Sequence, residues 1–144
     1  MEMLKHAHSG FRWILLAFLL YAIYNAFTGW RSNRAYGNTD RKINLFTMIS
    51  AHIMLLLGLA LYVLGERYQI NSEIMKTRAL RFYAVEHISM MLLAIILITI
   101  GNGRAKRGKT DLKKFKVSFW LFLIALFVIL AAIPWPGEYG AGWF

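Results

Sequence analysis

Four stretches of this chain are apolar for about twenty residues each, and they constrain the fold more than any other feature. They cover about residues 11–30, 45–64, 82–100 and 117–133. An α-helix needs about 20 predominantly apolar residues to cross the hydrocarbon core of a bilayer. Because lipid offers no hydrogen bonds to the backbone, only helices and closed barrels span membranes. We therefore predict an all-α fold, an integral membrane four-helix bundle that forms a single domain over residues 1–144.

The composition agrees with this class and excludes several redox groups. Hydrophobic residues make up 58% of the chain, and there is no cysteine. Without cysteine the chain cannot hold a thiolate-ligated iron–sulfur cluster, a covalently attached c-type haem or a disulfide. Any redox group must therefore be held without a covalent bond to sulfur, by His, Met or carboxylate side chains.

The basic residues predict the orientation of the bundle. The formal net charge is +10, and most Lys and Arg residues lie in the connections after the first and third apolar runs. Cytoplasmic loops are enriched in Lys and Arg, so we expect an up-down-up-down bundle with both termini outside. This explains the charge without nucleic acid as a partner. We read the first run as a span and not as a cleaved signal peptide, and we expect a multi-pass protein of the bacterial inner (cytoplasmic) membrane.

Three histidines, His8, His52 and His87, lie in or beside three different apolar runs. An ionisable side chain within a membrane-spanning segment usually serves a functional site. Neutral imidazole is the commonest protein ligand for haem iron and for several other metals. Helical bundles build such sites from side chains that project inward from separate helices. The three histidines are therefore the candidate ligands of a haem or a metal ion.

Two estimates of depth rank these histidines differently. With a rise of 1.5 Å per residue, His87 lies about 7 Å and His52 about 18 Å inside the outer lipid boundary, whereas His8 lies about 6 Å outside it. A hairpin that turns near Asn71–Ser72 instead places His52 and His87 level, since their midpoint is residue 69.5. The second estimate needs no lipid boundary. We therefore predict His52 and His87 as the first ligand pair and His8 with His87 as the second.

Other side chains fit a haem site near the outer end of the bundle. His8 and Arg12 are four residues apart and share a helical face. Arg12, or Arg81 near the start of the third span, can pair with a carboxylate such as a haem propionate. Gly58 and Ala60 are small enough to allow close approach of a flat ring or another helix. Methionine is an alternative axial ligand, and the candidates are Met48, Met54, Met90 and Met91.

Turn and capping residues predict where the helices end. The second helix should begin after the turn Tyr36–Asn38 and run to about Tyr68. An outer connection with a cap at Asn71 or Ser72 should lead into a helical, amphipathic segment over residues 73–81. The remaining expectations are a cap at Thr39 or Asp40, an end of the third helix at Gly101–Gly103 and an end of the fourth at Pro134.

Several short motifs resemble a family of small bacterial four-helix membrane proteins usually labelled cytochrome b. They are His6-Ala-His8-Ser-Gly-Phe-Arg12-Trp13, Ser50-Ala-His52, Arg81-Phe82-Tyr83-Ala-Val-Glu86-His87 and Ile133-Pro-Trp-Pro136. The resemblance extends over nearly the whole chain. It implies a b-type haem and electron transfer. In architecture the chain is also similar to the haem-bearing membrane anchors of respiratory dehydrogenases, which pass electrons between a quinone and a soluble subunit.

These observations predict a membrane-integral b-type cytochrome, an electron-transfer protein and not a stand-alone enzyme. Its haem b would be ligated by His52 and His87, with His8 and Arg12 near the outer haem edge or forming part of a second site. One alternative is a non-haem Cu, Fe or Zn site built from the same histidines, with Glu86 as a further ligand. Another is a non-catalytic membrane subunit of a larger respiratory or transport complex. The expected partners are membrane lipid, a quinone or a respiratory subunit, and an oligomer partner that packs on the fourth helix.

Overall fold

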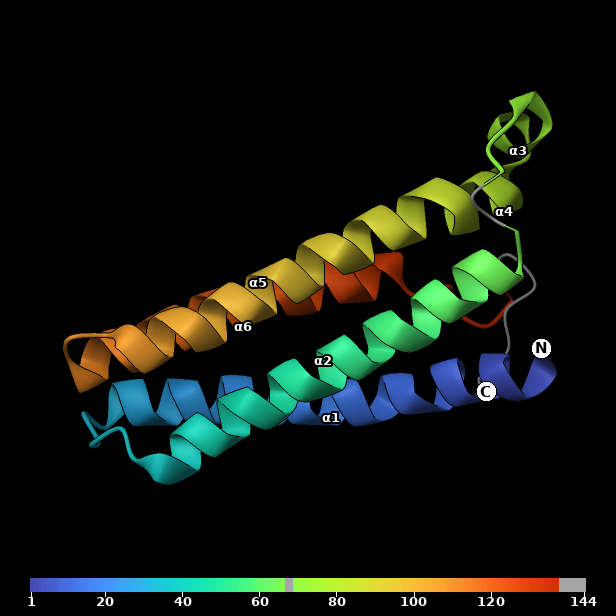
Figure 1. Ribbon diagram of the computed structural model, residues 1–144. Helices are drawn as coiled ribbons and strands as arrows, with labels where there is room; N and C mark the ends of the chain where they lie inside the picture. Colours follow the sequence, from blue (N-terminus) through green and yellow to red (C-terminus); the bar gives the residue numbers. More distant parts are fainter. Residues whose placement is uncertain (67–68, 138–144) are drawn as a thin grey trace.

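The structure, a computed structural model, describes residues 1–66 and 69–137 (Figure 1). Its long helices are α1 (Glu2–Arg31), α2 (Asn38–Leu64), α5 (His87–Arg107) and α6 (Asp111–Ala132). The short helices α3 (Ser72–Lys76) and α4 (Arg78–Arg81) and the π-helix η1 (Phe82–Glu86) precede α5. Four segments of the described chain are long and apolar enough to cross a membrane, and the predicted all-α membrane four-helix bundle is confirmed.

The four long helices form a closed ring of neighbours. α1 packs against α2 and α6, and α5 packs against the same two helices. Consecutive long helices run in opposite directions, so α1 begins and α6 ends at the same end of the bundle (Figure 1). The order is up-down-up-down. Side chains from all four helices can therefore meet in the interior at any one level.

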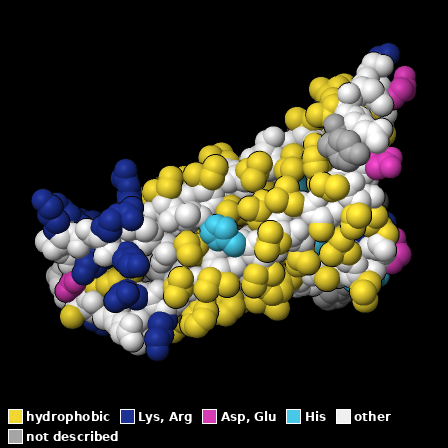
Figure 2. All heavy atoms as spheres, in the orientation of Figure 1, with side chains coloured by type: hydrophobic (Ala, Val, Ile, Leu, Met, Phe, Trp, Pro, Cys, Tyr) yellow, Lys and Arg dark blue, Asp and Glu magenta, His cyan; other side chains and the backbone are white. Residues whose placement is uncertain are grey.

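The surface is divided between apolar and basic regions (Figure 2). Hydrophobic side chains cover the middle of the visible face, and Lys and Arg gather at one end. That end carries the α1–α2 and α5–α6 connections, where the sequence places most of its basic residues. Leu56 of α2 and Phe127 of α6 are among the most exposed apolar side chains. A broad exposed apolar band is the surface that a bilayer requires of a membrane protein.

Small residues let the helices approach closely, which is typical of packing between membrane helices. A Cβ atom at Gly29 of α1 would overlap the buried ring of Phe115 on α6. A Cβ atom at Gly101 of α5 would lie 2.7 Å from a ring carbon of Phe122. The predicted end of the third helix at Gly101–Gly103 is therefore wrong. The missing side chain of Gly101 serves helix packing, and α5 continues to Arg107.

A buried carboxylate fixes the turn between α1 and α2. Asp40 accepts hydrogen bonds from Asn25 Nδ2 at 2.8 Å and from Arg34 at 2.8 and 3.0 Å. It also accepts one from the backbone N–H of Gly37 at 2.8 Å, immediately before α2 begins at Asn38. The N-cap of α2 is therefore Gly37 and not Thr39 or Asp40 as predicted, and Asp40 supports the helix start from the third helical position. Because the carboxylate joins both helices and the loop, it holds the two helices in register.

The outer connection differs in part from the prediction. Asn71 caps α3, since its side-chain oxygen accepts a hydrogen bond from the backbone N–H of Ile74 at 3.0 Å. The helix predicted over residues 73–81 is broken at Thr77, whose φ and ψ of −85° and 111° are extended. As a result α3 projects away from the bundle, whereas α4 continues into η1 and α5 (Figure 1).

Two further helix ends bear on the site. α2 ends at Leu64, earlier than predicted, and the predicted end at Tyr68 lies outside the described residues. α6 ends at Ala132, just before Pro134, as predicted. Between α4 and α5 the chain forms one π-helical stretch, η1, which leads directly into His87. Such stretches are rare and often occur at functional sites.

Candidate functional site: two histidines across a bundle cavity

A cavity of about 340 Å³ lies in the bundle near the start of α1 and the end of α6. Its volume is within the range of about 300–1,000 Å³ that small-molecule sites occupy. Most of its wall is apolar and comes from all four long helices, with Leu15, Met54, Ile95 and Ile129 as examples. The polar and ionisable side chains among its described lining residues are Lys5, His8, Ser9, Arg12, Tyr62, Tyr83 and His87.

His8 of α1 and His87 of α5 face each other across this cavity. Their ring centroids are 6.3 Å apart, and the ring planes are inclined by 70°. A metal–imidazole bond of about 2.0–2.1 Å, plus about 1.1 Å from nitrogen to ring centre, separates two imidazoles on opposite sides of one ion by slightly more than 6 Å. The ring separation therefore fits a pair of axial ligands. Each imidazole of such a pair can rotate about its bond to the ion, so an angle of 70° between the ring planes is compatible with this arrangement.

His87 is held in a fixed orientation by a neighbouring helix. Its Nδ1 lies 2.7 Å from the backbone carbonyl oxygen of Ala132 on α6. A carbonyl only accepts, so Nδ1 carries the proton and the Nε2 lone pair is directed elsewhere. The rings of Phe82 and Tyr83 in η1 lie 5.8 and 6.5 Å from the His87 ring. Metal-ligating histidines almost always donate their other N–H in this way.

His8 is held less firmly than His87. Its Nδ1 is buried and has no hydrogen-bond partner within residues 1–66 and 69–137. The ring lies against Gly58 of α2, where a Cβ atom would be 3.3 Å from His8 Cε1. A buried polar atom without a partner costs about 1–3 kcal/mol. A ligand bound at Nδ1 itself would remove this cost, and the glycine provides the space that the ring occupies.

Cationic side chains lie one turn on either side of His8. Arg12 is buried, and its guanidinium carbon lies 5.1 Å from the centre of the Trp13 ring. Lys5 is exposed and pairs with Glu2 at 2.7 Å. Both line the cavity, and none of the described residues that line it is acidic. The expected outward-lying position of Arg12 is corrected, because the side chain is buried in the wall of the site.

Arg81 and Glu86 do not belong to this cavity. Arg81 Nε donates to Glu86 Oε1 at 2.8 Å, and both side chains are exposed by 40% or more. Neither is among the residues that line the cavity. The predicted role of Arg81 as a partner for a ligand carboxylate is therefore not supported by its position. The carboxylate of Glu86 already pairs with the guanidinium of Arg81 and neutralises its charge.

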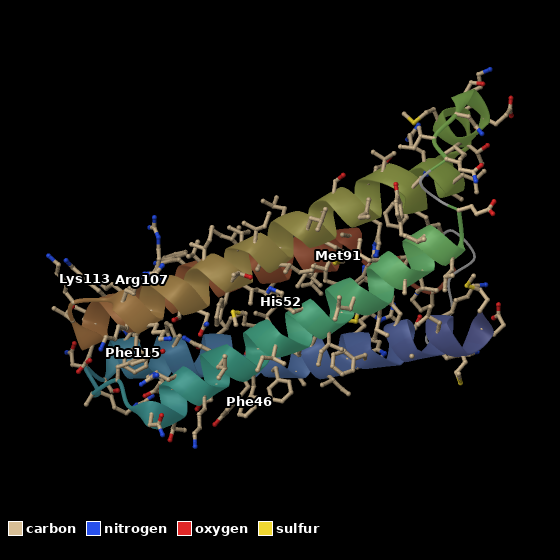
Figure 3. All side chains as sticks on the ribbon, in the orientation of Figure 1. Phe46, His52, Met91, Arg107, Lys113 and Phe115 are labelled. Atoms are coloured by element: carbon tan, nitrogen blue, oxygen red, sulfur yellow. The ribbon has the colours of Figure 1, made fainter. Side chains whose placement is uncertain are left out.

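His52 lies away from the other two histidines. Its ring is half-buried beside α5 (Figure 3), and its Nδ1 is 2.8 Å from the carbonyl oxygen of Met48, one turn earlier on α2. It does not line the cavity, whereas Gly58, six residues later on α2, does. At a rise of 1.5 Å per residue the two positions differ by about 9 Å in depth. The structure therefore pairs His87 with His8 and not with His52.

The connection between α2 and α5 is asymmetric, and this explains why His52 does not lie level with His87. Tyr62 donates to the carbonyl of Ala84 at 3.2 Å, and Asn102 donates to Met48 Sδ at 3.3 Å. These pairs centre the α2–α5 hairpin near residues 73–75, not at 69.5. The additional residues of α3, α4 and η1 all precede α5, so they shift its register against α2. His52 is consequently level with residues near Ile98, and His87 with residues near Gly58.

The donor set of the cavity consists mainly of the two histidines. Met54 and Met91 also line it, whereas Met48 and Met90 do not. Over residues 1–66 and 69–137 no group of three or more His, Asp or Glu side chains is placed to hold a metal ion. A bare Zn²⁺ site takes three or four protein ligands. Two opposed imidazoles fit an ion whose other ligands come from a macrocycle.

Sequence reasoning did not identify the carbonyl of Ala132, the group that orients His87. Backbone carbonyls carry no sequence signal, so only the packing of α6 on α5 could locate it. The sequence did contain an indication that His8 belongs to the site. Its spacing of four residues from Arg12 places an imidazole and a guanidinium on one helical face. Comparisons with protein-family models, with curated proteins and with solved structures give no match for the chain.

Proposed function

We propose that this protein is a membrane-integral b-type cytochrome in which His8 and His87 are the axial ligands of one haem b. The observation that carries the proposal is the separation of 6.3 Å between the two imidazole rings across an apolar cavity. Haem supplies one-electron transfer. The chain supplies two imidazole ligands and a wall of low dielectric constant, which together set the reduction potential.

The other residues of the cavity fit the same ligand. Arg12, one turn deeper along α1 than His8, lines the same cavity, where its buried guanidinium can pair with a propionate carboxylate. Apolar side chains surround the rest, which suits the faces of a porphyrin. With no cysteine in the chain, the haem is held by ligation and packing alone.

The distribution of basic residues indicates which side of the membrane the cavity faces. The basic end of the bundle is the end opposite the cavity (Figure 2). By the positive-inside rule the basic end faces the cytoplasm, so the cavity, the start of α1 and the end of α6 face outward. In a bacterial inner membrane the haem would then exchange electrons near the periplasmic surface. A membrane quinone or a subunit of a respiratory complex is the class of partner that reaches this depth.

Optical spectroscopy of the purified protein tests the proposal. Protein from cells supplied with a haem precursor should show a Soret band and the reduced-minus-oxidised peaks of a b-type cytochrome. Acid extraction should remove the haem, because no covalent bond holds it. A colourless preparation with full helix content and a monodisperse elution profile would contradict the proposal. It would favour the alternative of a non-catalytic membrane subunit, or of a bare metal ion where metal analysis found one.

A further inference from the structure

The two histidines of the cavity are anchored to very different extents. His87 bonds to α6 through the Ala132 carbonyl and lies within the continuous helical segment Arg78–Arg107. His8 has no hydrogen-bond partner for Nδ1 in the described part of the chain. Partners that fix a ligating histidine typically contribute about 10–100-fold to metal affinity. The His87 side of the site is therefore the stronger one.

The helical turns that carry His8 are also weakly packed. In the first seven residues only Leu4 is partly buried, and the other six are exposed. Segments with few buried apolar contacts open locally at a small cost in free energy. A movement of these turns away from the bundle would withdraw the His8 ring while α2, α5 and α6 remain packed.

The space around His8 allows such a movement. On the α2 side the ring contacts only the backbone position of Gly58, which has no side chain to interlock with it. The cavity also extends past His8 to Lys5 and Met1. No side chain at position 58 therefore blocks the ring on the α2 side. A diatomic molecule can then occupy the vacated volume.

We propose that His8 is an exchangeable ligand and that this side of the cavity binds small neutral molecules of the carbon monoxide class. The inference rests on the proposed function. With haem bound, His8 would give up its bond to the reduced iron, and the carbon lone pair of the incoming molecule would take its place. No electron or proton is transferred. His87 would hold the haem throughout, so the site would bind a small ligand without releasing haem.

Carbon monoxide binding to the reduced protein tests this inference. The His8→Ala variant should retain haem, become five-coordinate and high-spin, and bind carbon monoxide with an apparent affinity at least about tenfold above that of the unaltered protein, because the competing ligand is gone. His6→Ala, a change at an exposed histidine on the same helix, should match the unaltered protein. In the unaltered protein, the binding rate should saturate with ligand concentration at the rate of His8 dissociation.

The outcomes separate the two proposals. A colourless unaltered protein contradicts the proposed function itself. If the unaltered protein contains haem but does not bind carbon monoxide after reduction, or if His8→Ala loses its haem, then His8 is a permanent ligand and the inference is overturned. Haem retention and carbon monoxide binding in His87→Ala, with haem loss in His8→Ala, would reverse the assigned roles and equally overturn it.

Discussion

Replacing His87 with alanine should remove haem from the protein almost completely. Partners that only orient a ligand contribute about 10–100-fold to metal affinity, so loss of the anchored ligand itself should cost more than about 100-fold. The weakly held His8 would be the only histidine left at the cavity. The measurement is the haem-to-protein ratio of purified protein, from the absorbance of the extracted haem and the protein concentration.

His52→Ala is the matched control for this variant. His52 is also half-buried, and its Nδ1 also lies within hydrogen-bond distance of a backbone carbonyl, but it lies outside the cavity. Its replacement should leave the haem content unchanged. The two variants thus distinguish the pair His8 and His87, which the structure brings together, from the pair of His52 and His87 predicted from the sequence. Haem loss in His52→Ala, together with retention in His87→Ala, would refute the assignment of the ligands.

A leucine at Gly58 should exclude haem although both histidines remain. The Cβ atom alone would lie 3.3 Å from His8 Cε1, and the rest of the side chain would extend into the site. We expect the haem content to fall at least about tenfold, with a loss of stability of about 1–3 kcal/mol from overpacking. Haem content and thermal unfolding, measured on the same preparation, report the two effects separately.

Gly10→Leu provides the control for this substitution. Gly10 lies on α1 two residues from His8, but a Cβ atom there meets nothing within 4 Å. The change adds the same side chain near the same ligand without entering the cavity, since Gly10 does not line it. It should leave the haem content and the stability near those of the unaltered protein. Equal haem content in both variants would mean that haem binds elsewhere.

The sequence predicts the bundle well because its signals are local. Apolar runs of membrane-spanning length mark the four long helices, and Asn71 and Pro134 mark a start and an end that the structure confirms. Gly101 misled the prediction, because a glycine that ends a helix and one that packs under a phenylalanine ring look alike in a sequence. Only the position of Phe122 on another helix distinguishes them.

The site depends on register between helices, which local signals do not determine. A hairpin centred at residue 69.5 requires a symmetric connection between α2 and α5. In the structure α3, α4 and η1 all lie on the α5 side of this connection. The move of the hairpin centre from residue 69.5 to residues 73–75 was enough to exchange His52 for His8 as the neighbour of His87. The argument from helical rise, which placed His52 well below His87, agrees better with the structure. The residue types of the site were thus identifiable, but their pairing required the packing.

Low-temperature electron paramagnetic resonance of the oxidised protein tests the central claim most directly, since the spectrum reports which atoms lie on the two sides of the iron. The arrangement of His8 and His87 predicts a low-spin ferric signal of two imidazole nitrogens, with one haem per chain. The same signal should disappear in His8→Ala and persist in His52→Ala. A high-spin signal from the unaltered protein, or a bis-imidazole signal that is lost with His52 and kept without His8, would contradict it.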